Sequence, residues 1–206
     1  GVNAMRIHGA NVVGVEMDDE GMELDGLERA FRTEPNVKLL YVIPTFQNPS
    51  GKTMSLARRK AIYELCVKYG VMILEDNPYG ELRFRGEDIP TFKSMDDEGI
   101  VIYNGSYSKV LSAGMRIGFV MAQKDVLQRL TVAKQFSDCH SNIFFQIVTD
   151  EWLKTADVDA HIARIRKIYR DRCDFMLRLL DEHMDKRVTY TRPDGGLFLW
   201  CTLPEG

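Results

Sequence analysis

The chain has 206 residues, of which 45% are hydrophobic and 28% are charged, so it is long enough and apolar enough to bury one substantial core. Its net charge of −3 excludes the overall basic character of a nucleic-acid-binding protein, and no apolar run approaches the ~18 residues of a membrane span. The four cysteines and four histidines lack metal-ligand spacing and receive no predicted role in a site. Because no signal peptide is present either, we expect a cytoplasmic protein without a metal, nucleic-acid or membrane partner.

Strand and helix patterns alternate along the first two thirds of the chain. Apolar runs predict strands near residues 11–17, 38–43, 71–75, 100–104 and 117–122. Apolar residues at helical spacing predict helices near residues 25–33, 55–69 and 125–137. In the clearest of them, Ser55 is suited to cap the start and Gly70 to end the helix. This alternation is typical of an α/β fold with a mostly parallel sheet and flanking helices.

The last third of the chain has a different pattern. An apolar helix is expected over 143–153, an amphipathic helix from about 159 to 184, and two short strands over 188–191 and 196–201. The basic stretch 164–172 can also be interpreted as a phosphate-backbone patch. Its apolar residues keep helical spacing and acidic residues flank it, which favours a solvated helix face.

Polar residues follow three of the predicted strands. Asn48, Asp76 and Lys109 each come shortly after an apolar run, and the carboxyl ends of strands in an open α/β sheet are where ligands bind. The amine of Lys109 can form a Schiff base with an aldehyde. A carboxylate such as Asp76, facing a pyridine nitrogen, would keep that nitrogen protonated. A lysine and an acid in this arrangement indicate pyridoxal phosphate as the cofactor.

Each candidate residue also has a purely structural interpretation. A lone lysine is usually a surface charge, and Asn48 before a proline is a natural turn residue. Tyr79 can be a half-buried aromatic residue, and Arg116 a charge at a strand edge. Ser106 and Ser108 can be loop hydroxyls with only local partners. The functional interpretation rests on these candidate residues taken together, and no single residue is sufficient for it.

The order of these motifs resembles that of fold-type I pyridoxal-phosphate enzymes, in the class I and II aminotransferase group. The motifs are Asn-Pro-Ser-Gly at 48–51, Asp-x-x-Tyr at 76–79, Ser-x-Ser-Lys at 106–109 and Arg-Ile-Gly at 116–118. Residues 75–79, 90–95 and 106–109 resemble the branch that acts on 2-aminoadipate, kynurenine and aromatic amino acids. The resemblance implies that residues 1–158 are part of the cofactor-binding large domain. Residues 159–206 would then be the long connecting helix and the beginning of the small C-terminal domain.

The resemblance also implies catalytic roles for Lys109, Asp76 and Tyr79. Lys109 would hold the cofactor as an internal aldimine and move the proton at the substrate Cα. Asp76 would pair with the pyridinium nitrogen, and Tyr79 and Asn48 would hydrogen-bond to the phenolic oxygen of the cofactor.

The phosphate of the cofactor would be bound by the loop that follows the strand predicted near residues 100–104. By resemblance, Ser106 and Ser108 donate from their hydroxyls and Arg116 forms a charged fork. The group's phosphate-cupping loop and its substrate-carboxylate arginine are expected before Gly1 and beyond Gly206. We therefore expect a fragment that is inactive by itself, belonging to a full-length protein that is a homodimer.

The resemblance implies transfer of an amino group from an amino acid to a 2-oxo acid by a ping-pong route. One alternative is the aminotransferase-like sensor domain of a winged-helix transcriptional regulator, which resembles this branch in the same motifs. Another is a pyridoxal-phosphate lyase or decarboxylase, because cofactor-binding residues do not decide which bond at Cα breaks.

Overall fold

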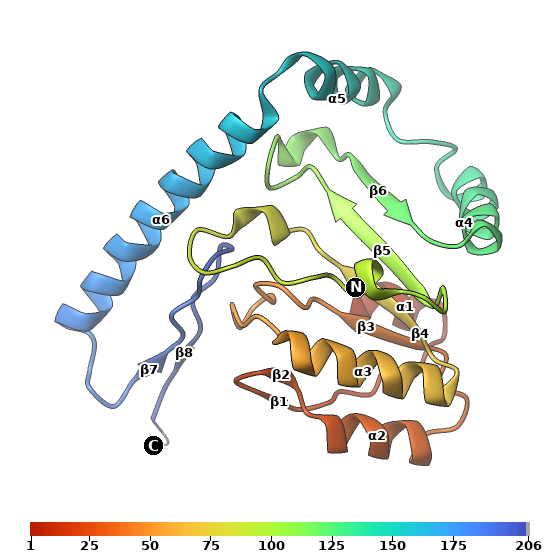
Figure 1. The fold of residues 1–206 in the computed structure, drawn as a ribbon, viewed down its shortest axis with the longest axis horizontal. Helices are drawn as coiled ribbons and strands as arrows, with labels where there is room; N and C mark the ends of the chain where they lie inside the picture. Colours follow the sequence, from red (N-terminus) through yellow and green to blue (C-terminus); the bar gives the residue numbers. More distant parts are fainter. Residues whose placement is uncertain (205–206) are drawn as a thin grey trace.

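A four-stranded sheet lies at the centre of the computed structural model, which describes residues 1–204 (Figure 1). Its strands are β3 (Leu39–Val42), β4 (Met72–Asp76), β5 (Val101–Ser106) and β6 (Gly118–Met121). They lie in the order β3-β4-β5-β6, with β3, β4 and β5 parallel and β6 antiparallel to β5. The predicted α/β fold with a mostly parallel sheet is confirmed.

Helices and two small antiparallel hairpins surround this sheet. The α-helices are α1 (Val2–Ile7), α2 (Leu24–Thr33), α3 (Leu56–Tyr69), α4 (Lys124–Ser137), α5 (Ile143–Thr155) and α6 (Val158–His183). The 3-10 helices are η1 (Gly80–Leu82), η2 (Lys93–Met95) and η3 (Ala113–Met115). The hairpins pair β1 (Met17–Asp18) with β2 (Gly21–Met22), and β7 (Thr189–Tyr190) with β8 (Cys201–Thr202). The helices predicted near 25–33, 55–69, 125–137, 143–153 and 159–184 are thus confirmed.

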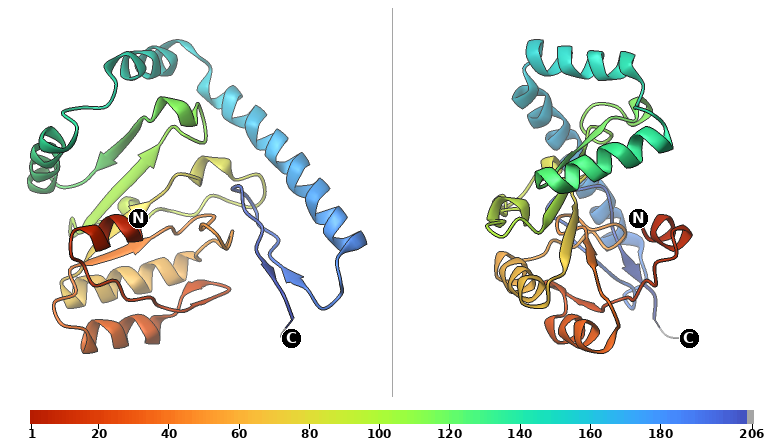
Figure 2. Two further views of the ribbon diagram at one scale, coloured as in Figure 1. Left: turned by 180° about the vertical axis from the view of Figure 1, so that it is seen from behind. Right: turned by 90° about the vertical axis from the view of Figure 1, so that its right-hand side faces the viewer.

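The core lies between one face of the sheet and the pair α2 and α3. Figure 2 shows these two helices on one side of the sheet and α1 on the other. Leu27 of α2 and Ile62 of α3 are buried against strand residues such as Ile73. Cys66 of α3 lies in the same cluster, and burial raises the pKa of its thiol to about 12. The thiol is therefore a neutral packing group.

The ends of α3 follow the residues predicted for them. The Ser55 hydroxyl accepts a hydrogen bond from the backbone N–H of Arg58 at 3.2 Å. Gly70 ends the helix in the left-handed conformation, with φ of 65°, which a residue with a Cβ adopts only with strain.

Replacing Ser55 with alanine should lower the free energy of unfolding by about 1 kcal/mol, because the first turn of α3 loses its side-chain acceptor. Urea denaturation measures this change. The matched control is Ser137→Ala, since the Ser137 hydroxyl is exposed and bonds only to a carbonyl of its own helix. Equal losses in the two variants would contradict the capping role.

Two buried charges fix the loops around β4. Glu75 is fully buried, accepts hydrogen bonds from the backbone N–H groups of Phe92 and Lys93, and has its pKa raised by burial. Arg59 is also fully buried, and burial lowers its pKa to about 10, so it stays charged at neutral pH. Its guanidinium donates to oxygens of Pro44, Thr45, Met54 and Pro90. Side chains alternate along a strand. Because Glu75 points to the buried face of the sheet, the next residue, Asp76, points to the opposite face.

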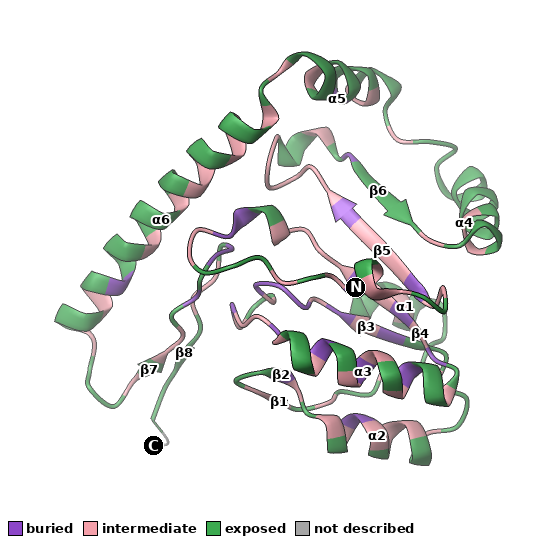
Figure 3. Cartoon of the chain, viewed as in Figure 1, coloured by how far each residue is buried: buried purple, intermediate pink, exposed green. Residues whose placement is uncertain are grey.

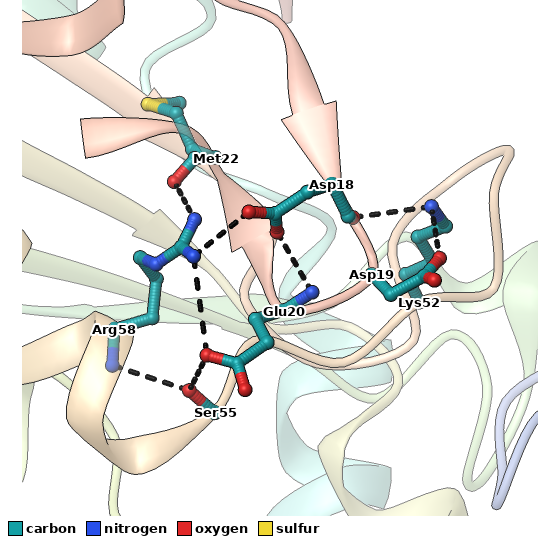
Figure 4. Close-up of polar contacts among 7 residues, drawn as sticks. All are labelled: Asp18, Asp19, Glu20, Met22, Lys52, Ser55 and Arg58. Atoms are coloured by element: carbon teal, nitrogen blue, oxygen red, sulfur yellow. Dashed lines mark hydrogen bonds and ion pairs between the residues drawn. The ribbon is translucent and has the colours of Figure 1, made fainter. Parts of the chain in front are cut away.

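The β1–β2 hairpin braces the loop between β3 and α3 (Figure 4). The Arg58 guanidinium pairs with the Asp18 carboxylate at 2.8 Å and donates to the carbonyl of Met22 at 2.6 Å. The Lys52 ammonium pairs with Asp19 at 2.9 Å and donates to the carbonyl of Asp18 at 3.1 Å. These contacts hold both α3 and the loop that carries Asn48 against the hairpin.

The region of β6, α4 and α5 is largely exposed (Figure 3). All four residues of β6 are exposed, α4 has no buried residue, and α5 buries only Thr149. Helix α6 leads from α5 back to the β7–β8 hairpin (Figure 1). None of the helices in residues 1–204 is both long and apolar enough to cross a membrane.

Two strand predictions are wrong in part. Of the strand expected over 11–17, residues 11–16 form no strand and only Met17 pairs, as the first residue of β1. Val15 packs against the core cluster, so burial under α2 and not pairing accounts for its apolar character. The strand expected over 196–201 is limited to β8, which pairs Cys201 with Tyr190. The residues before β8 instead pack on the loop beside Asn48.

Candidate functional site

Asp76 is held by two neighbouring strands at the end of β4. The Tyr41 hydroxyl of β3 donates to its Oδ2 at 2.7 Å, and the Asn104 amide of β5 donates to its Oδ1 at 2.8 Å. The register explains this, because Asn104 pairs directly with Asp76 while Tyr41 pairs with Leu74, two residues earlier on the same face. All three polar side chains are partly exposed. A Cβ on Gly1 would come within 2.8 Å of the Tyr41 ring, which places this face on the α1 side.

Tyr79 and Asn48 lie with Asp76. Tyr79 is 6% exposed and packs edge-on against Phe198, with ring centroids 5.3 Å apart. Burial raises the pKa of Tyr79, and the negative charge of Asp76 raises it further. The side chain of Asn48, which lies at the Tyr79 hydroxyl, acts in the opposite direction. The structure thus brings three predicted site residues together. Asn48 itself is exposed and precedes a cis peptide bond to Pro49.

The segment 193–198 supports this cluster from the C-terminal side. A Cβ on Gly195 would lie 2.2 Å from the ring of Phe46, so only glycine allows the turn to approach the loop that carries Asn48. The backbone N–H of Gly196 donates to the carbonyl of Leu82 at 3.1 Å, which joins the turn to the segment after Tyr79.

The lysine lies in a tight turn at the end of β5. The N–H of Ser108 donates to the Ser106 hydroxyl oxygen at 3.1 Å, and the N–H of Leu111 donates to the carbonyl of Tyr107 at 2.8 Å. Lys109 is partly buried within this turn. Across residues 1–204, its ammonium group makes no hydrogen bond or ion pair. The amine is therefore available for covalent chemistry.

Helix α6 holds the same turn through His161. Its Nε2 lies 2.7 Å from the carbonyl oxygen of Val110, which can only accept, so the proton is on Nε2. The guanidinium of Arg164 lies 3.3 Å from Nδ1 and can only donate, so Nδ1 accepts. The ring also packs edge-on against Trp152, with centroids 5.5 Å apart. The fold therefore gives a structural role to a histidine for which the sequence indicated none.

Arg116 lies across the β5–β6 hairpin from the serines. Ser106 pairs with Gly118, two residues after Arg116, and this register places the arginine beside the turn. Its backbone is left-handed, with φ of 56°, and its guanidinium is exposed and donates to the carbonyl of Ala113 at 3.4 Å. In the described part of the chain, no hydrogen bond or ion pair joins Arg116 or Lys109 to the other predicted site residues.

The side chains at this edge of the sheet form a set of complementary polar groups, which we call the donor set. They offer a braced carboxylate, a phenol with an amide beside it, two hydroxyls, a guanidinium and a free amine. This set suits a ligand with a ring nitrogen, a ring oxygen, a phosphate and an aldehyde, the groups of pyridoxal phosphate. Within residues 1–204, no group of three or more His, Cys, Asp or Glu side chains is placed to hold a metal ion.

Two site residues escaped prediction, Tyr41 and Asn104. Both are polar residues inside otherwise apolar strands, which is the signal that was available. Their contact with Asp76 depends on strand order and register.

Known proteins are similar to this chain over nearly its whole length. The family model described as aminotransferase class I and II matches residues 2–206. An aromatic-amino-acid aminotransferase of Thermococcus litoralis is 43% identical over 100% of this chain and 50% of its own length. An alpha-aminoadipate aminotransferase of Thermus thermophilus, solved with N-(5'-phosphopyridoxyl)-L-leucine, is 38% identical with a TM-score of 0.93, over 100% of this chain and 53% of that one.

An uncharacterized HTH-type transcriptional regulator of Bacillus subtilis is also similar, with 36% identity over 95% of this chain and 40% of its own length. The chain spans about half the length of the aminotransferases that it matches. The match of the family model to nearly the whole chain shows that this chain belongs to the class I and II aminotransferase family.

Proposed function

We propose that the full-length protein is a pyridoxal-phosphate-dependent aminotransferase that moves an amino group from an amino acid to a 2-oxo acid. The observation that carries this proposal is the amine of Lys109, which makes no hydrogen bond or ion pair within residues 1–204 and lies in the turn after β5, the strand paired with β4 and Asp76. Membership of the aminotransferase family supports it. The names of the similar proteins favour aromatic amino acids or 2-aminoadipate as the amino donor.

When bound, the cofactor supplies an electron sink for negative charge at the substrate Cα. Lys109 would hold the cofactor through its amine and would move the proton at the substrate Cα. Asp76 would accept a hydrogen bond from the protonated ring nitrogen, and Tyr79 and Asn48 would orient the ring by hydrogen bonds to its oxygen.

The phosphate has its own set of residues. The hydroxyls of Ser106 and Ser108 would donate to it, and Arg116 would provide a compensating positive charge. Since Arg116 is exposed and bonded only to a local carbonyl, its guanidinium is free to turn toward a phosphate.

Borohydride reduction of the full-length protein with its cofactor, followed by peptide mapping, tests the covalent role. We expect the pyridoxyl label on Lys109, because its amine makes no hydrogen bond or ion pair within the described residues 1–204. Recovery of the label on Lys52 or Lys124 would remove Lys109 from the proposed mechanism.

A second candidate function is a sensor domain of a transcriptional regulator. The similarity to the HTH-type regulator of Bacillus subtilis favours it, since that similarity covers 95% of this chain. A helix-turn-helix segment preceding residue 1, together with specific DNA binding and no amino transfer, would support the regulator.

Release of carbon dioxide, or turnover without a 2-oxo acid acceptor, would instead indicate a decarboxylase or lyase.

A further inference from the structure

We propose that Tyr41 is a positioning residue of this site, which fixes the orientation of the Asp76 carboxylate so that it can accept a hydrogen bond from the ring nitrogen of the cofactor. The inference rests on the proposed function, because it concerns what Asp76 does toward that ring. It adds a residue that none of the sequence motifs contains.

The first argument is geometric. Asp76 receives one hydrogen bond on each carboxylate oxygen, at 2.7 Å from Tyr41 and at 2.8 Å from Asn104. The donors come from the strands on either side of β4, so together they fix the rotation of the carboxylate about its bond to Cβ. Each oxygen keeps a second lone pair, and one of these can accept from a ring N–H.

The second argument concerns the proton that Asp76 and a ring nitrogen would share. Burial, the hydrogen bond to Asp76 and the negative charge of Asp76 all raise the pKa of Tyr41, so its hydroxyl remains a donor at working pH. Hydrogen bonds donated to a carboxylate favour its ionised form. A bound ring nitrogen would therefore keep its proton, which would strengthen electron withdrawal. Without the Tyr41 hydroxyl, the nitrogen would hold that proton less firmly.

The neighbouring strand offers a matched control hydroxyl. Tyr103 of β5 is partly buried, and its hydroxyl accepts from the Asn77 amide at 3.0 Å and does not touch Asp76. Burial raises the pKa of Tyr103 as well. Tyr103→Phe and Tyr41→Phe thus each remove one partly buried tyrosine hydroxyl from this sheet, and only the second removes a donor to Asp76.

The test uses both variants in the full-length protein loaded with ring-¹⁵N-labelled pyridoxal phosphate. We expect Tyr41→Phe to lower kcat about 10- to 100-fold with little change in KM, the effect of losing a hydrogen bond to a charged group that acts in the transition state. The ¹⁵N resonance should move toward that of unprotonated pyridine in Tyr41→Phe and stay unchanged in Tyr103→Phe.

In the protein without cofactor, Asp76→Asn should lower the pKa of Tyr41, measured by NMR of ¹³Cζ-labelled tyrosine.

The outcomes are separable. If the wild type transaminates with its cofactor on Lys109, and Tyr41→Phe matches Tyr103→Phe in rate and in ¹⁵N resonance, the positioning role is overturned. A slower Tyr41→Phe variant with an unchanged ¹⁵N resonance indicates only a packing role and also overturns it. If the wild type carries no cofactor on Lys109, the proposed function fails first, and the role of Tyr41 fails with it.

Discussion

Replacing Lys109 with alanine should lower kcat for amino transfer by roughly 10⁴-fold or more. Proton transfer by a positioned group contributes about 10²- to 10⁴-fold, and the covalent attachment of the cofactor is lost in addition. The Lys109 ammonium makes no hydrogen bond or ion pair within residues 1–204, so stability should change little. Steady-state kinetics of the full-length variant and the loss of its bound-cofactor absorption band measure the effect.

Lys124→Ala is the matched control for that experiment. Lys124 is the first residue of α4 and lies outside the donor set at the sheet edge, so its removal should leave kcat unchanged. A Lys109→Ala variant with more than a few per cent of wild-type kcat would show that another group performs the proton transfer.

The fold was largely predictable because its signals are local. Ser55 caps α3 and Gly70 ends it, as residue types with those conformational preferences should. The expected strand over 11–17 failed because an apolar residue that packs under a helix, as Val15 does, gives the same signal as one in a strand. Apolar periodicity reports burial, whereas pairing depends on a neighbouring strand.

The candidate site was predictable only where its residues follow strands in recognisable motifs. Asp76 and Lys109 were selected in this way, since the carboxyl ends of parallel strands share one edge, and their chemical roles stay predictions. Tyr41 and His161 were not, because their contacts depend on strand register and on the path of α6 past the turn at Val110. Separations of 35 and 51 residues join these partners, and no local pattern encodes such pairs.

Replacing Asp76 with asparagine should lower kcat by about 10²- to 10³-fold while the cofactor remains bound. In the proposed mechanism the carboxylate acts mainly when negative charge develops at the substrate Cα, and removing one charge partner of a transition state costs about this much. The asparagine side chain keeps one acceptor oxygen for Tyr41 or Asn104, but its NH₂ group meets the other donor. Cofactor binding changes less, because Lys109 and the phosphate residues are intact.

Single-turnover kinetics and cofactor dissociation, measured on the same full-length variant, separate these two effects. Asp97→Asn is the control, since Asp97 is exposed and its side chain makes no hydrogen bond within residues 1–204. If Asp76→Asn reacts at nearly the wild-type single-turnover rate, Asp76 has no part in the chemistry. If it instead loses cofactor in proportion to rate, Asp76 is a binding residue, and the braces supplied by Tyr41 and Asn104 serve affinity and not catalysis.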